Sequence, residues 1–176
     1  MANREALREL QTRLASRLQA ARTEGMSVAW LALRVGGKNL LFPLGQSGEI
    51  FPLTSLQPVP YSRAWFRGVL NIRGGLYGVV DLAAFLAEDG GGARLEPPAQ
   101  DPTVVTLNIA LEVNCALQVD GLLGLRGTDG FASSSPPDPT SPPYFGNQFL
   151  DTAGERWQEI DLRILSQTPQ FLSISA

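Results

Sequence analysis

Few residues in this sequence have the chemistry of an active site, and their spacing does not group them. The chain contains no histidine, so the commonest general base and metal ligand is missing. Asp81 and Asp161 could act as a pair of acid and base carboxylates. Each precedes a leucine and a short helical pattern, where an aspartate commonly caps a helix. We therefore predict two capping residues. The alternative, a small carboxylate-dependent hydrolase, requires both side chains in one cleft.

The remaining candidates for nucleophilic, metal-binding or phosphate-binding chemistry are weak. Cys115 is the single cysteine, so it can form neither an internal disulfide nor a thiolate cluster, and its apolar surroundings predict a buried, inert thiol. The glycines at 90–92 lack the Lys-Ser/Thr ending of a phosphate loop, and the serines at 133–135 have no histidine base. The sequence therefore predicts no catalytic residue, no metal site and no cofactor.

An arginine within a hairpin pattern is the best candidate for recognition. Residues 66–82 read Phe-Arg-Gly-Val-Leu-Asn-Ile-Arg-Gly-Gly-Leu-Tyr-Gly-Val-Val-Asp-Leu, in which Arg73, Gly74 and Gly75 separate two apolar runs. The glycines supply the positive φ of a tight turn, and the apolar runs suit a half-buried sheet. Arg73 at the tip is either a binding residue, since arginine is enriched at interface hot spots, or a solvated turn residue with a local ion-pair partner.

Bulk composition excludes several classes of partner. Of the 176 residues, 44% are apolar and 18% are charged, which is typical of a globular protein. A net charge of −3 gives no electrostatic footprint for nucleic acid. No apolar run reaches membrane-spanning length, and the charged N-terminus lacks the core of a signal peptide. We therefore expect a cytoplasmic protein without direct membrane insertion, which a partner could recruit to membrane receptor arrays.

The N-terminal segment predicts one amphipathic helix over residues 3–23. Its leucines recur at steps of three and four and so share one face: Leu7, Leu10, Leu14 and Leu18. Two interpretations stay open, a helix docked on its own domain and a helix that binds a partner or a second copy. We divide the chain into this helix, residues 1–25, and a β domain, residues 26–176.

The rest of the sequence predicts mainly β structure. Strands are expected at 28–35, 39–44, 48–53, within 66–80, and at 103–111, 114–119, 122–125, 144–150 and 157–162. Short helical segments are expected at 81–86 and near Leu165. The composition of residues 87–102 is that of a linker, and the Ser/Pro-rich residues 132–143 predict a mobile loop.

The hairpin pattern recurs 80 positions later in the chain. Leu70 aligns with Leu150, Gly74 with Gly154, Tyr77 with Trp157, Val80 with Ile160, Asp81 with Asp161, and Leu82 with Leu162. The simplest interpretation is two similar small β subdomains, one in each half. Arg73 aligns with Ala153 and so is absent from the second copy. A residue that the shared fold does not require is the better functional candidate.

Three segments resemble the CheW family of chemotaxis coupling proteins. The first is Phe-Arg-Gly-Val-Leu-Asn-Ile-Arg-Gly at 66–74 with Val-Val-Asp-Leu at 79–82. The others are Leu-Leu-Phe-Pro-Leu-Gly-Gln-Ser-Gly-Glu-Ile at 40–50 and Ala-Leu-Gln-Val-Asp-Gly-Leu-Leu-Gly-Leu at 116–125. The resemblance covers residues 27–174. The helix and the degenerate second half resemble the CheW-type proteins of type IV pilus (twitching) systems more than the flagellar proteins.

The resemblance implies two small five-stranded β-barrel subdomains around a shared hydrophobic seam, beside the N-terminal α-helix. It also implies a non-enzymatic adaptor that joins methyl-accepting chemotaxis receptors to a CheA-type histidine kinase. The family's receptor-binding arginine corresponds to Arg73, with Gly68, Val69 and Asn71 beside it. Ser47 and Gly78 depart from the family pattern, which commonly has a branched apolar residue and a proline there.

The same resemblance implies a second contact on the first barrel. Its Glu-Ile pair, Glu49 and Ile50 here, belongs to the kinase-facing strand. The hypothesis is thus a scaffold in a chemotaxis-like signalling system controlling type IV pili. The alternative is an oligomeric structural β-barrel protein without a signalling role.

Overall fold

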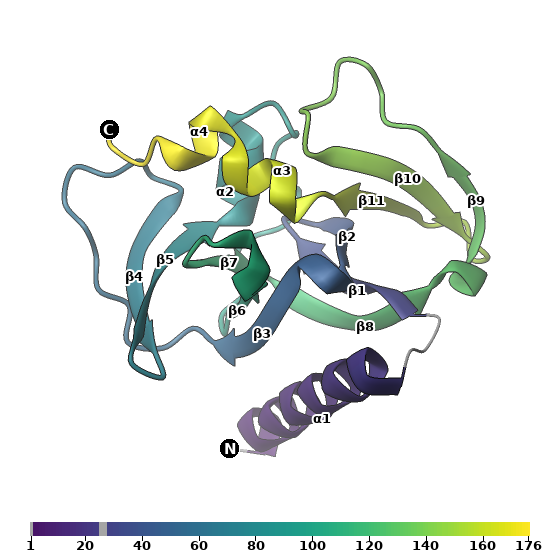
Figure 1. The fold of residues 1–176 in the computed structure, drawn as a ribbon, viewed down its shortest axis with the longest axis horizontal. Helices are drawn as coiled ribbons and strands as arrows, with labels where there is room; N and C mark the ends of the chain where they lie inside the picture. The colour runs from purple at the N-terminus through teal and green to yellow at the C-terminus, as the bar shows by residue number, and fades with distance from the viewer. Residues whose placement is uncertain (1, 25–27) are drawn as a thin grey trace.

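A computed structural model describes residues 2–24 and 28–176. Helix α1 (Ala2–Glu24) lies beneath a β-rich body that carries three short helices, α2 (Leu82–Glu88), α3 (Leu162–Gln167) and α4 (Pro169–Leu172) (Figure 1). The predicted N-terminal helix is therefore confirmed. The predicted boundary at residues 25–26 lies outside the described residues. Within the described part of the chain, no helix combines the length and the apolar composition needed to cross a bilayer.

The strands form two sheets. The five-stranded sheet has the order β3-β6-β7-β5-β4. Its strands are β3 (Ser47–Pro52), β4 (Phe66–Ile72), β5 (Gly75–Asp81), β6 (Thr103–Leu107) and β7 (Cys115–Val119). The six-stranded sheet has the order β8-β1-β2-β11-β10-β9. Its strands are β1 (Val28–Val35), β2 (Lys38–Pro43), β8 (Gly121–Gly127), β9 (Phe131–Ser135), β10 (Phe145–Asp151) and β11 (Arg156–Ile160).

The two sheets share one topology. The order β3-β6-β7-β5-β4 matches β8-β1-β2-β11-β10, and each contains a parallel pair, β5 with β7 and β11 with β2. Strand β9 is an addition to the second sheet, which therefore has six strands instead of the expected five. Two similar β subdomains are confirmed. Part of the Ser/Pro-rich segment predicted as a mobile loop is strand, because residues 133–135 pair with β10.

The assignment of one subdomain to each half of the chain is wrong. The β1–β2 hairpin from the first half pairs with β8 and β11, whereas the β6–β7 hairpin from the second half pairs with β3 and β5. A local repeat does not reveal this exchange, because strand pairing is a long-range interaction. Each sheet contains strands from both halves, so neither half has a complete sheet of its own.

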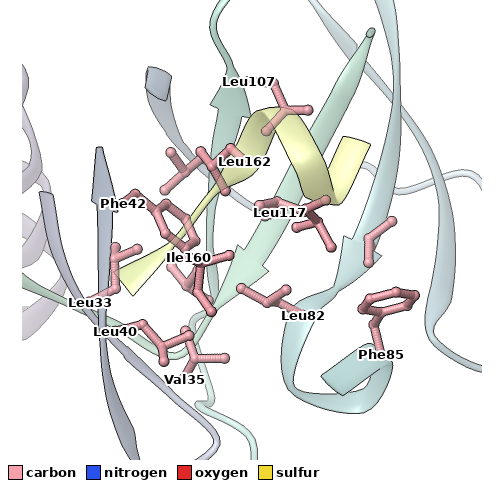
Figure 2. Close-up of a cluster of buried hydrophobic side chains, with 14 of the residues drawn as sticks. Leu33, Val35, Leu40, Phe42, Leu82, Phe85, Leu107, Leu117, Ile160 and Leu162 are labelled. Carbon is pink, nitrogen blue, oxygen red and sulfur yellow. The ribbon is translucent and has the colours of Figure 1, made fainter. Parts of the chain in front are cut away.

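A buried seam joins the two sheets. Figure 2 shows side chains from both sheets meeting there, including Leu33 and Phe42 from the six-stranded sheet and Leu117 from the five-stranded one. Leu82 and Leu162, the first residues of α2 and α3, are also fully buried in this cluster. The predicted shared hydrophobic seam is present, and apolar burial on this scale is the main term stabilising such a fold.

Both predicted capping aspartates cap helices. Asp81 Oδ1 accepts a hydrogen bond from the Ala84 N–H at 3.2 Å, and Asp161 Oδ1 accepts one from the Ile164 N–H at 3.0 Å. Asp81 also pairs with Arg94, whereas Asp161 contacts Gln46. The two carboxylates thus have different partners around different helices, as the repeat predicted. This arrangement gives no support to a hydrolase built on the pair.

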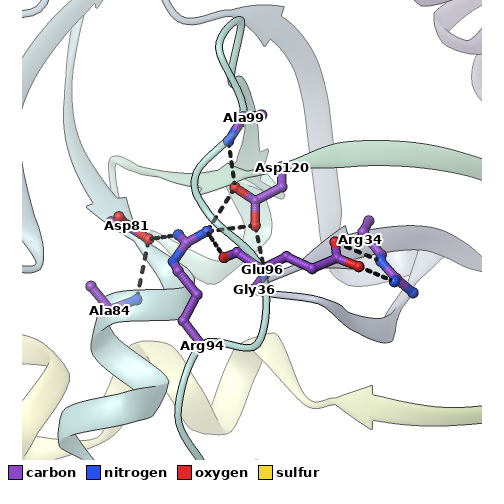
Figure 3. A network of polar contacts seen from close by, with 8 residues as sticks. All are labelled: Arg34, Gly36, Asp81, Ala84, Arg94, Glu96, Ala99 and Asp120. Atoms are coloured by element: carbon purple, nitrogen blue, oxygen red, sulfur yellow. Dashed lines mark hydrogen bonds and ion pairs between the residues drawn. The ribbon is translucent and has the colours of Figure 1, made fainter.

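The segment 87–102 has a linker's composition but is firmly attached. Arg94 reaches from it to Asp81 and Asp120, and the Ala99 N–H donates to Asp120 Oδ1 at 3.3 Å (Figure 3). Backbone also participates, since the Leu95 N–H donates to the Gly36 carbonyl at 2.7 Å. The segment is therefore bound to both sheets by polar contacts that its composition did not predict.

Candidate protein-binding site

Arg73 occupies the turn between β4 and β5. Ile72 pairs with Gly75, so the two-residue turn consists of Arg73 and Gly74, not of the predicted glycine pair. Both residues have positive φ, 50° and 82°, as a type I′ turn requires. The Asn71 side-chain oxygen accepts the Gly74 N–H at 3.0 Å and so braces the turn.

The conformation of Arg73 is costly for a residue with a side chain. A left-handed backbone costs an L-residue roughly 1–2 kcal/mol relative to the right-handed helical region, and glycine escapes this cost. The second copy of the hairpin has a similar brace, because Asp151 accepts the Ala153 and Glu155 N–H groups at 2.9 Å. The brace belongs to the repeated fold, but the arginine does not. A strained arginine at an exposed tip is therefore a candidate for function.

Arg73 pairs with Glu49, so the two residues assigned to different partners contact each other. The Arg73 guanidinium lies 2.8 Å from Glu49 Oε2, and their side chains are 72% and 54% exposed. It also lies over the ring of Phe51, 5.5 Å from the centroid. An exposed ion pair contributes about 0–1 kcal/mol, so a partner could replace either member at little cost.

The Arg73–Glu49 ion pair forms part of the lining of a hollow that has both polar and apolar side chains. The hollow has a volume of about 370 Å³ and opens between the β4–β5 turn and the short 3₁₀ turn Ile109–Leu111. Apolar side chains line it: Phe51, Ile72, Tyr77, Leu107 and Ile109. Ile109 is 92% exposed. An exposed isoleucine next to aromatic side chains and an exposed ion pair is typical of a surface that binds another protein.

The other predicted residues lie on β3 and β4, outside the lining of the hollow, and differ in exposure. Val69 is half-buried on β4 and forms a bridge with Gln57, whose N–H donates to the Val69 carbonyl at 2.9 Å. Gly68 is buried, and a Cβ there would collide with the Gln57 carbonyl. Gly68 thus lets the segment after β3 approach β4. Ile50 is half-buried and packs against the seam.

Sequence reasoning missed the apolar part of the site. Phe51 directly follows the Glu-Ile pair, and this adjacency could have indicated it. Ile109 gave no such signal, because its exposure depends on the 3₁₀ turn between β6 and β7 that projects it. The predicted inert thiol is confirmed, since Cys115 is buried and burial raises the pKa of its thiol to about 12. Among the described residues, no three Cys, Asp or Glu side chains gather as metal ligands would.

Comparison with known proteins identifies the family. The profile of the CheW-like domain matches residues 29–168, and the chain belongs to this family. Protein PilI of Pseudomonas aeruginosa is 31% identical over 127 residues, which are 71% of this chain and 68% of that protein. The crystal structure of the scaffolding protein TtCheW from Thermoanaerobacter tengcongensis superposes with a TM-score of 0.65 at 16% identity. That match covers 82% of this chain and 96% of TtCheW, and it shows a shared fold.

Proposed function

We propose that this protein is a non-enzymatic adaptor that couples methyl-accepting chemotaxis receptors to a CheA-type histidine kinase. Membership of the CheW-like family supports the class of function. The observation that supports the proposal is the exposed Arg73–Glu49 ion pair, because it joins the residue that we assign to the receptor with the residue that we assign to the kinase. A conformational or binding event at one residue can then change the availability of the other.

The physical basis of this coupling is competition for a shared ion. A carboxylate on the receptor that binds Arg73 competes with Glu49 for the same guanidinium. When Glu49 is released, its carboxylate on β3 loses its cation and becomes available to bind the kinase. Coupling of two sites through one exchangeable contact is reciprocal, so kinase binding at Glu49 would also free Arg73 for the receptor.

The finer assignment is a system that controls type IV pili. The likeness to PilI and the sequence resemblance to the CheW-type proteins of twitching systems support it. The location that we propose is cytoplasmic, with recruitment to receptor arrays through the receptor contact. In this scheme Asn71 holds the turn that carries Arg73, Val69 and Gly68 shape strand β4 before that turn, and the half-buried Ile50 adds an apolar contact on β3.

Pull-down of the purified chain with a receptor signalling fragment tests the receptor contact. Arg73→Ala and Arg73→Glu should fold normally and lose binding, the second more completely because it adds repulsion. Arg163→Glu is the matched control, since Arg163 is an exposed arginine on α3, away from the hairpin. Receptor capture by both Arg73 variants at the wild-type level would remove this assignment and favour the oligomeric structural protein.

A further inference from the structure

Helix α1 buries only half of its leucine face. Leu14 and Leu18 are 8% and 4% exposed, and Leu18 belongs to the core of the domain. Leu7 and Leu10 continue the same stripe toward the N-terminus, yet they are 43% and 52% exposed. The apolar face of one helix therefore extends beyond the surface that covers it.

The uncovered half lies past one end of β3. The Gln11 side chain donates to Thr103 Oγ1 at 3.1 Å, and Thr103 pairs with Pro52, the last residue of β3. Figure 1 shows α1 running beside β3, which is an edge strand of its sheet. The exposed leucines, which precede Gln11, thus extend beyond the Pro52 end of β3, on the face of the sheet to which Ile50 contributes.

The size of this patch indicates what it can bind. The exposed area of two half-exposed leucines is far smaller than the roughly 800 Å² that each partner buries in a stable interface. The patch alone is therefore too small to hold two copies of this chain together as a dimer. It suits the extension of a neighbouring contact. The neighbouring contact is the strand that we propose to face the kinase.

The charge of α1 indicates the chemistry of the partner. Residues 2–24 carry five arginines and three glutamates, a formal charge of +2, whereas the remainder of the chain carries −5. Arg4, Arg8 and Arg17 are exposed, and none of them forms an ion pair within the described part of the chain, whereas Arg13 pairs with Glu9. Free arginines that flank an apolar stripe complement an apolar surface bordered by carboxylates.

We propose that Leu7 and Leu10 of α1 form, together with β3, one continuous docking surface for the CheA-type kinase. The kinase segment that it binds is apolar and bordered by Asp or Glu. This inference rests on the proposed function, because that function supplies the neighbouring contact. It adds the N-terminal helix as a second anchor, which strengthens kinase binding and leaves the receptor contact unchanged.

Titration of the full-length kinase of the same organism against the full chain tests the inference. Leu7→Glu/Leu10→Glu should weaken kinase binding at least tenfold while receptor pull-down stays unchanged. Thr12→Glu/Ser16→Glu adds the same charge to the opposite face of α1 and should bind within twofold of wild type. Leu7→Ala/Leu10→Ala removes apolar contact without adding charge and should give an intermediate loss. Circular dichroism checks that each variant folds.

The outcomes separate the two proposals. If the Leu7→Glu/Leu10→Glu variant binds the kinase as tightly as the wild-type chain does, the proposed role of α1 is overturned. The adaptor function is unaffected by that result. A wild-type chain that does not bind the kinase would overturn the adaptor function, and this inference with it. A dimer in light scattering that the double glutamate variant abolishes would assign the patch to self-association and contradict the inference.

Discussion

Replacement of Arg94 by methionine should destabilise the domain, because one guanidinium joins three parts of the chain. Arg94 is 20% exposed and lies 3.2 Å from Asp81 Oδ1 and 3.0 Å from Asp120 Oδ2. Asp81 caps α2, and Asp120 lies between β7 and β8 and accepts the Gly36 and Ala99 N–H groups. The variant removes the cation and leaves both carboxylates in place.

The expected loss follows from the burial of these carboxylates. Asp81 and Asp120 are 14% and 11% exposed, and removal of one partner from a buried ion pair costs about 3–5 kcal/mol. Each carboxylate keeps at least one backbone N–H donor, which moves the value to the lower end. We therefore expect the free energy of unfolding to fall by about 3 kcal/mol in urea titrations at neutral pH, followed by circular dichroism.

A matched pair of variants isolates the cause. Arg34→Met breaks the more exposed pair with Glu96, whose side chains are 36% and 50% exposed, and should cost about 1 kcal/mol or less. The double variant Arg94→Met/Asp120→Asn should lose less unfolding free energy than the two single variants lose in sum. The reason is that the neutral amide at position 120 no longer needs a cation. An Arg94→Met variant that loses less than about 1 kcal/mol would refute the reasoning that this network is buried and coupled.

Three further predictions concern the interior of the fold. The Trp157 indole, which donates to Asp151 at 2.9 Å, holds the pKa of that carboxyl below its usual range. The stability that the ionised Asp151 contributes is therefore present above about pH 4 and is lost as the pH falls below that value. Asp151→Asn should consequently reduce the drop in Tm between about pH 5 and 3. Cys115 should react with a thiol reagent at pH 8 only after unfolding, because its pKa is about 12. Gly68→Ala should destabilise the domain by about 2 kcal/mol or more in urea titrations, because its φ is +133° and its new Cβ meets the Gln57 carbonyl.

Local sequence signals predicted the parts of the fold that local physics determines. The leucine spacing of α1, the β1–β2 hairpin and the caps at Asp81 and Asp161 depend on residues close in sequence, and the structure contains all of them. The repeat also predicted two subdomains of one topology. It did not predict the exchange of hairpins between the sheets, since pairing of β2 with β11 joins residues more than a hundred positions apart.

The candidate site was predictable to a similar extent. Arg73 and Glu49 could be selected from the turn pattern and the family resemblance, but their contact depends on the curvature of a five-stranded sheet whose edges carry them. Ile109 and Arg94 were missed for the same reason. The exposed Ile109 and the partly buried Arg94 are distinguished by their tertiary surroundings, and no local sequence pattern reveals either of them.

The most direct test of the adaptor function is whether the chain bridges the two partners. Immobilised receptor fragment should capture the kinase only when this protein is added. Arg73→Glu should abolish capture of the kinase by the receptor, because the receptor needs a cation at the turn. The same variant should still bind the kinase directly. Kinase capture that is independent of the adaptor, or unchanged with Arg73→Glu, would contradict the account.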